Sequence, residues 1–140
     1  MYKYCLIFFL LIISCKEKNS FKEISINENI LKEIKEDTDI SKGSGVYIIS
    51  LFTDKGKNIC EITRYKETPT STNFIGCQLL KKDTVLLYVD KKSKFLKCYK
   101  LSNKHIKINK KQFAIRDKKE IGYYKLDTLN CLIKKFKLTQ

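Results

Sequence analysis

The sequence predicts a single α+β domain, in which a curved antiparallel β-meander packs against an N-terminal helix and a second helix near the C-terminus. Three observations lead to this fold class. Residues 27–37 are amphipathic and begin with a capping residue, and residues 46–101 contain five short segments rich in β-branched and aromatic residues. Near the C-terminus, apolar residues recur at helical spacing.

The first expected element is a helix over residues 27–37. Asn27 can cap it, because its side-chain oxygen can accept a hydrogen bond from an otherwise unpaired backbone amide. Ile30, Leu31 and Ile34 form one apolar stripe, and charged residues fill the opposite face. This stripe predicts that the helix packs on the sheet.

The next expected elements are strands joined by short connections. We expect strands at residues 46–52, 58–65, 74–80, 84–89 and 95–101. Between the first two, Asp54-Lys55-Gly56 is a turn signal. Because parallel neighbours need long crossover connections, the short connections predict an antiparallel meander.

The C-terminal segment permits two interpretations. Four apolar residues follow helical spacing, namely Leu129, Leu132, Ile133 and Phe136. Asp127 can cap this segment, so we predict a helix, and a strand over residues 132–138 is the competing interpretation. Upstream, we expect Tyr123 and Tyr124 to separate, with one ring in the core and one ring outside it.

The N-terminus has the features of a signal peptide. Lys3 precedes an unbroken apolar run over residues 5–13. This run is too short for a membrane-spanning helix, which needs about 20 apolar residues, but it suits the core of a signal peptide. The run ends in Ile12-Ile13-Ser14-Cys15, in the order aliphatic, variable, small, cysteine. This order resembles the lipobox of bacterial lipoproteins.

The resemblance implies that the chain is cleaved before Cys15, that the Cys15 thiol carries a lipid, and that the new N-terminus carries a fatty acid such as palmitate. Several acyl chains hold a protein stably to a membrane, whereas one holds it only weakly. We therefore assign residues 1–14 to the signal peptide, 15–22 to the anchor and a polar tether, and 23–140 to the folded domain. Cys15-Lys16-Glu17 also resembles the sorting signal of some surface lipoproteins, so we expect the outer membrane, at its periplasmic or cell-surface face.

The chain is strongly basic, with 29 Lys and Arg residues against 15 Asp and Glu residues and a formal net charge of +14. Such an excess favours anionic partners such as lipid headgroups, acidic polysaccharide or an acidic protein. Only Arg64 and Arg116 are arginines. Because arginine is the usual residue for bidentate recognition of phosphates and bases, the composition argues against nucleic-acid binding and favours a solvated basic surface.

Four cysteines remain after the leader cysteine and Cys15 are set aside, and they are Cys60, Cys77, Cys98 and Cys131. An even number in an exported chain predicts disulfides, and three pairings are open. Cys60 and Cys77 lie equally far from the Thr68-Pro69 bond, so a hairpin centred there would place them opposite each other. Buried free thiols are the alternative. A zinc site is not expected, because closely spaced cysteine pairs are absent from the sequence.

The sequence contains no recognisable catalytic motif, and we expect neither a cofactor nor an enzyme. His105 is the only histidine, it stands among lysines, and no orienting partner or nucleophile accompanies it. Isolated acids are expected to be solvated, namely Glu61, Glu67, Asp90 and Glu120. Thr84 and Thr128 each follow an aspartate and precede an aliphatic residue, which resembles the O-glycosylation acceptor of some Gram-negative envelope proteins; a turn and a helix cap are the alternatives.

These features together predict a lipid-anchored, non-enzymatic envelope protein that acts by binding. Two narrower hypotheses are an immunity or inhibitor protein directed against an envelope toxin or hydrolase, and a structural protein of envelope assembly. Most aromatic residues fall in expected strands, where core packing explains them. An exposed aromatic row on one sheet face would instead indicate a sugar or peptide site.

Overall fold

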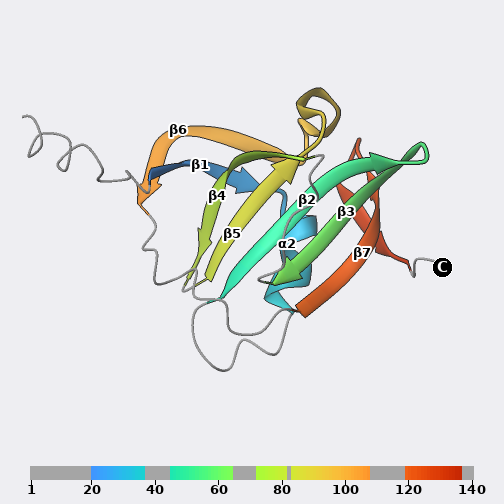
Figure 1. Cartoon of the computed structure of the whole chain (residues 1–140), viewed down its shortest axis with the longest axis horizontal. Helices are drawn as coiled ribbons and strands as arrows, with labels where there is room; N and C mark the ends of the chain where they lie inside the picture. The colour runs from blue at the N-terminus through green and yellow to red at the C-terminus, as the bar shows by residue number, and fades with distance from the viewer. Residues whose placement is uncertain (1–19, 37–44, 65–71, 82, 108–118, 137–140) are drawn as a thin grey trace, which may run out of the picture.

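The computed structural model describes residues 20–36, 45–64, 72–81, 83–107 and 119–136. These residues form one eight-stranded mixed sheet with the order β6-β1-β4-β5-β2-β3-β7-β8, backed by one α-helix (Figure 1). The elements are β1 (Ser20–Ile26), α2 (Glu28–Lys35), β2 (Val46–Asp54), β3 (Lys57–Arg64), β4 (Asn73–Leu80), β5 (Asp83–Val89), the 3-10 helix η2 (Lys92–Phe95), β6 (Tyr99–Lys107), β7 (Lys119–Asp127) and β8 (Leu132–Lys135). The fold is therefore essentially all-β, and the predicted α+β class is wrong.

The predicted N-terminal helix is confirmed as α2, which lies behind the sheet in Figure 1. The Asn27 side chain accepts a hydrogen bond of 2.9 Å from the Asn29 amide, as expected for an N-cap. Ile30, Leu31 and Ile34 are fully buried against the sheet. We call the sheet face that α2 covers the inner face and the opposite face the outer face.

The predicted C-terminal helix is wrong, because this segment forms a turn followed by β8. Asp127 caps the turn, and its carboxylate accepts hydrogen bonds from the Leu129 amide at 3.0 Å and from the Asn130 side chain at 3.1 Å. Cys131 adopts a left-handed backbone with φ of 53° and forms a disulfide with Cys98, so a helix cannot continue through it. Of the four helically spaced residues, only Ile133 packs against the core.

The predicted antiparallel meander is also wrong. β2 with β3 and β4 with β5 are antiparallel pairs, as expected from their short separations. However, β5 lies parallel beside β2, and β1 lies parallel beside β4. Strands that are neighbours in the sheet can thus be far apart in sequence, which connection lengths alone do not reveal.

Two strands, β1 and β7, were not expected from the sequence, and both contain irregularities that interrupt the alternation of apolar residues. The pairing register shifts between Lys22 and Ile24 in β1, and it shifts where β7 faces Ile62 and Thr63 of β3. Such bulges move the apolar side chains out of the period of two that identifies a strand. Because β1 begins at Ser20, residues 20–22 belong to the sheet rather than to the tether.

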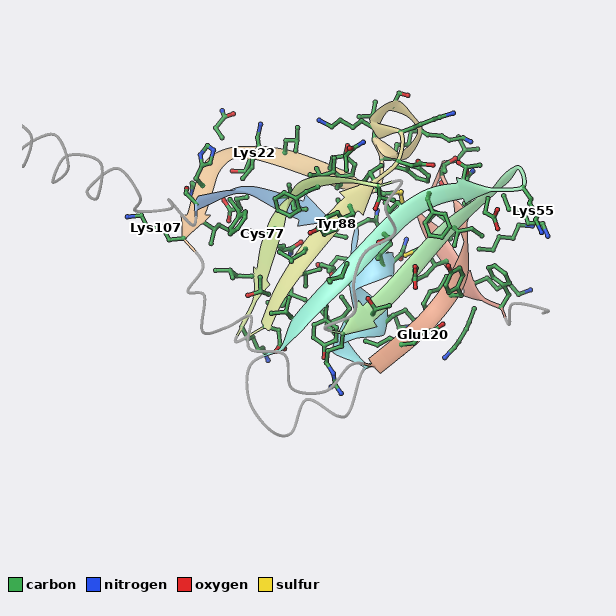
Figure 2. The ribbon with its side chains drawn as sticks, in the orientation of Figure 1. Lys22, Lys55, Cys77, Tyr88, Lys107 and Glu120 are labelled. Carbon is green, nitrogen blue, oxygen red and sulfur yellow. A yellow bond between two sulfur atoms is a disulfide. The ribbon has the colours of Figure 1, made fainter. Side chains whose placement is uncertain are left out.

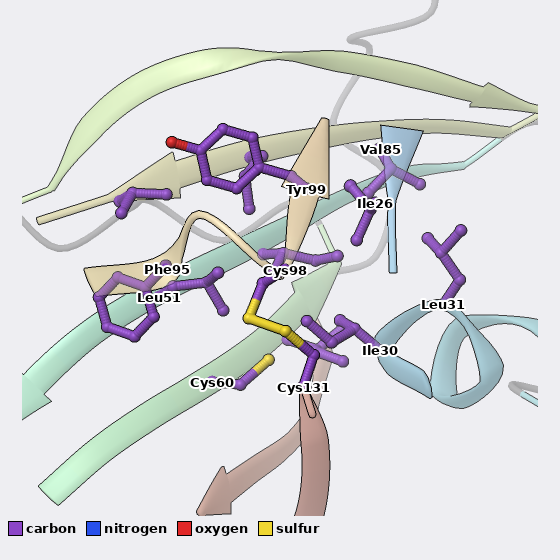
Figure 3. Close-up of a cluster of buried hydrophobic side chains, with 14 of the residues drawn as sticks. Ile26, Ile30, Leu31, Leu51, Cys60, Val85, Phe95, Cys98, Tyr99 and Cys131 are labelled. Carbon is purple, nitrogen blue, oxygen red and sulfur yellow. A yellow bond between two sulfur atoms is a disulfide. The ribbon is translucent and has the colours of Figure 1, made fainter. Parts of the chain in front are cut away.

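The core lies between the inner face and α2 (Figure 3). The disulfide between Cys98 and Cys131 lies within it, with the two Cα atoms 5.4 Å apart. This bond ties the segment between η2 and β6 to the turn between β7 and β8, which are 33 residues apart in sequence. The disulfide therefore joins elements from opposite edges of the sheet order.

Candidate functional site

The outer face of the sheet is turned toward the viewer in Figure 1, and Figure 2 adds its side chains. This face carries an apolar cluster that is only partly buried. Its base is formed by Val46, Cys77 and Leu86, which are buried. The side chains above them remain partly or substantially accessible, and we call them the outer patch: Phe21, Ile48, Phe74, Tyr88 and Ile106. Phe74 is 38% exposed. Partly exposed apolar side chains grouped in this way are typical of a binding surface.

The strand register extends this patch into a row that crosses the sheet. Cross-strand pairs link Phe74 to Tyr88, Tyr88 to Ser50, Ser50 to Glu61, and Glu61 to Tyr123. The row therefore crosses β4, β5, β2, β3 and β7 in turn. At a spacing of about 4.8 Å between strands, it is about 19 Å long.

The aromatic rings in this row make tilted or edge-on contacts with one another and with neighbouring rings. The Phe74 ring centroid lies 5.6 Å from that of Phe21 at 80° and 5.3 Å from that of Tyr88 at 59°. On the other side of the row, the Tyr123 ring lies 6.1 Å from Phe52 at 80° and 6.3 Å from Phe136 at 90°. In edge-to-face packing, the positive edge of one ring meets the negative face of another, so these rings already have favourable electrostatic partners within the protein. The rings therefore form two ridged clusters rather than a flat platform on which a sugar could stack.

A buried polar group separates the two aromatic clusters. Ser50 is 2% exposed and Glu61 is 7% exposed, so the expectation that Glu61 is solvated is wrong. The Tyr123 hydroxyl donates a hydrogen bond to the Glu61 carboxylate. Burial raises the pKa of Tyr123 to about 12, and the negative charges of Glu61 and Glu120 add to this shift. The neutral hydroxyl thus remains a donor to Glu61 over the physiological range.

Tyr123 and Tyr124 separate as predicted. Tyr124 points to the inner face, is 1% exposed, and donates a hydrogen bond of 3.0 Å to the Glu33 carboxylate of α2. Burial and this hydrogen bond both raise the pKa of Tyr124. Gly122 makes room for the ring, because a Cβ atom there would lie 2.6 Å from the Tyr124 hydroxyl oxygen.

The cysteines divide into one disulfide and two free thiols. The bonded pair is Cys98 and Cys131, whereas Cys60 and Cys77 are free and buried. The hairpin that would have paired Cys60 with Cys77 does not form, because β3 and β4 are separated in the sheet by β2 and β5. Cys60 lies in the core with its side chain toward the disulfide (Figure 3), and Cys77 lies beneath the outer patch.

Neither free thiol has the properties of a nucleophile. Burial raises the pKa of Cys77 to about 11, and Glu23 adds to the shift. Burial also raises the pKa of Cys60, together with the charges of Glu33 and Glu61. Because the thiolate is the reactive form, both groups are inert at neutral pH.

The remaining predicted site residues are not brought together. His105 is exposed on the edge strand β6, where its backbone pairs with Lys22. Within the described ranges, no group of three or more His, Cys, Asp or Glu side chains could hold a metal ion. Thr84 is 2% exposed within β5, which is incompatible with an accessible glycosylation acceptor. Thr128 lies partly exposed in the turn after β7.

Asp90 is structural, contrary to the expectation that it is merely solvated. Its carboxylate accepts hydrogen bonds from the backbone amides of Thr53 at 2.9 Å and Lys91 at 2.5 Å. These bonds fix the chain where β5 leads into η2. Glu120 is exposed at the start of β7, and Glu67 lies outside the described residues.

Cys15 and the rest of the leader also lie outside the described residues, so the lipid anchor remains a prediction. Within the part that is described, the only α-helix is too short and too polar to cross a bilayer. Comparison with models of protein families, with curated proteins and with solved structures found no match. Function must therefore be argued from the surface of this fold.

Proposed function

We propose that this protein is a lipid-anchored binding protein of the bacterial envelope and that the outer patch is its docking surface for another protein. The observation that carries the proposal is the partly exposed cluster of Phe21, Phe74 and Tyr88 on the sheet face opposite α2. Aromatic side chains dominate the binding energy of protein interfaces when they are enclosed by a partner.

A protein partner fits this surface better than a sugar. The rings of Phe21 and Phe74 lie at 80° to each other, so they present edges and ridges rather than one flat face. Ile48 and Ile106 complete the patch with aliphatic groups that a protein core would cover.

A binding role also accounts for the chemistry of the ionisable groups. His105 is exposed on a sheet edge, and the free thiols have raised pKa values. A general base needs a partner and a nucleophile within hydrogen-bond reach. The described residues offer His105 no such arrangement, and we propose that the protein is not an enzyme.

The proposal is tested by photo-crosslinking in intact cells. A photoreactive amino acid replaces Phe74, and the matched control places it at Leu132 of β8, which is more exposed at 53%. We expect a discrete protein adduct from position 74 that Tyr88→Ala abolishes, and no equivalent adduct from position 132. An adduct with a toxin or hydrolase would support the hypothesis of an immunity or inhibitor protein. An adduct with a component of envelope assembly would support the hypothesis of a structural assembly protein. Equal adducts at both positions, or none at position 74, would refute the docking surface.

A further inference from the structure

The charge of the described fold is concentrated along one edge. Residues 91–107, which run from the residue before η2 to the end of β6, contain one histidine and no acidic residue. They also contain seven lysines, all exposed, which we call the basic edge: Lys91, Lys92, Lys94, Lys97, Lys100, Lys104 and Lys107. The other described residues are nearly balanced, with eleven Lys and Arg residues against ten Asp and Glu residues. The large positive charge is therefore a property of this edge rather than of the whole described surface.

Adjoining acids offset only part of the charge of the basic edge. Glu23 and Asp90 adjoin it, and their carboxylates accept hydrogen bonds from neutral groups of this segment and of β2: Glu23 from the Ser102 hydroxyl at 3.3 Å, and Asp90 from the backbone amides of Thr53 and Lys91. Two salt bridges lie on α2, where Lys32 pairs with Glu36 and Lys35 pairs with Glu28. Seven lysines beside two carboxylates leave a net positive charge, and like charges repel one another, so this arrangement favours an external anionic surface.

The basic edge begins beside the predicted anchor. Ser20, the first residue of β1, pairs with Lys107 at the end of β6. Cys15 lies five residues before Ser20 in sequence, and five residues span at most about 18 Å. β6 has nine residues, a length of about 30 Å. Figure 2 shows Lys107 at the end of the molecule from which the chain enters β1.

Two exposed leucines accompany these lysines. Leu96 follows η2 and is 62% exposed, and Leu101 in β6 is 56% exposed. Binding at a membrane surface increases with the apolar area that enters the interface and with attraction to anionic lipids. The basic edge offers both contributions in one segment.

We propose that the basic edge lies on the anionic headgroup layer of the membrane that holds the lipid anchor. This inference rests on the anchor of the proposed function. The sheet then stands on its β6 edge, and the outer patch faces sideways, where a partner can reach it. A bilayer is favoured over a soluble polyanion because the anchor keeps the lysines near the headgroups, and their attraction acts only within a Debye length, about 8 Å at physiological salt.

The test uses the lipidated protein in vesicles of phosphatidylcholine alone and in vesicles that also contain phosphatidylglycerol. A water-soluble reagent acetylates accessible lysines, which are then quantified by mass spectrometry. We expect lysines of the basic edge to react at least about fivefold more slowly in the anionic vesicles, the effect of about one lysine–headgroup attraction. Lys35, Lys134 and Lys135 are internal controls that should react equally in both. High salt should remove the difference.

A charge-reversal variant, Lys92→Glu/Lys97→Glu/Lys104→Glu, should lose the protection of its remaining edge lysines. The matched variant Lys55→Glu/Lys134→Glu/Lys135→Glu carries the same charge change elsewhere and should keep it. Equal reactivity of edge lysines in both vesicle types, protection retained in the first variant, or protection by a soluble acidic polysaccharide but not by anionic vesicles would overturn the inference. Wild-type protein that floats with neither vesicle type would refute the anchor itself, whereas floating protein with an unprotected edge refutes this inference alone.

Discussion

Removal of the Cys98–Cys131 disulfide should destabilise the fold by an amount that its position in the chain defines. The two cysteines are 33 residues apart, and the crosslink restricts the unfolded chain to a closed loop of that length. The chain-entropy relation gives about 12.5 cal/mol/K for such a loop, or about 3.7 kcal/mol at 25 °C. This corresponds to a change of about 500-fold in the unfolding equilibrium. Because small domains are stable by only about 5–15 kcal/mol, this bond would supply about a quarter to three quarters of the total stability.

The assay compares urea unfolding of the protein with and without a reductant, and circular dichroism monitors the unfolding. We expect the unfolding free energy of the oxidised protein to exceed that of the reduced protein by about 3.7 kcal/mol. A Cys98→Ala/Cys131→Ala variant should respond to reductant no further. Cys60→Ala is the matched control, because Cys60 is also 0% exposed in the same core cluster but is not part of the crosslink. It measures the cost of truncating a buried thiol without opening a loop.

Three results would refute this reasoning. Oxidised and reduced protein could unfold within about 1 kcal/mol of each other, which is below the usual range for a native disulfide. The Cys60→Ala control could lose as much stability as the double variant, which would attribute the effect to packing. Non-reducing mass mapping could also recover Cys98 and Cys131 as alkylated thiols, in which case the bond does not form.

Two further predictions concern the packing of β4. Gly76→Ala should lower the unfolding free energy by about 2 kcal/mol in urea titrations, because the new Cβ would lie 2.5 Å from the Lys22 carbonyl oxygen, a backbone atom that cannot move freely. Cys77→Ala should flatten the alkaline part of the pH–stability profile. Burial raises the pKa of Cys77 from about 9 to about 11, so above pH 9 the unfolded state has lost this proton while the folded state retains it. Stability should therefore fall between pH 9 and 11 in the wild type and fall less in the variant.

The Gly76→Ala prediction has a matched control, and each of the two predictions has an outcome that would contradict it. Gly56 has φ of 75°, and a Cβ atom there would meet no neighbouring atom within 4 Å. Because asparagine tolerates this backbone conformation, Gly56→Asn should lower the unfolding free energy only slightly. Wild-type stability in Gly76→Ala would mean that β1 does not approach β4 this closely. Parallel pH profiles for the wild type and Cys77→Ala would mean that the thiol is not held protonated in the folded state.

The elements that the sequence predicted correctly depend on local chemistry. α2 was predictable because its cap, Asn27, and its apolar stripe lie within eleven consecutive residues. The turn between β2 and β3 was predictable from Lys55-Gly56, which adopt φ of 48° and 75° and close a two-residue hairpin. In both cases, neighbouring residues supply the signal and the structure.

The elements that the sequence missed depend on contacts between distant residues. The helical spacing near Leu129 is overridden because Cys131 is bonded to Cys98 from another part of the chain. The outer patch joins Phe21 to Phe74, which are adjacent only because β1 enters the sheet beside β4. Glu61 was expected to be solvated, but it is 7% exposed and accepts a hydrogen bond from Tyr123 of β7, a strand that was itself not predicted.

The sequence by itself determined the local segments, the positive charge and the four cysteines available for pairing, and it carries the lipobox resemblance. The tertiary structure decided which cysteines pair, which aromatic rings remain accessible, and how the lysines of η2 and β6 gather on one edge beside Ser20. The physical reason is strand order. A strand alternates its side chains between two faces, but its neighbours are chosen by the packing of the whole sheet, which one segment of sequence does not encode.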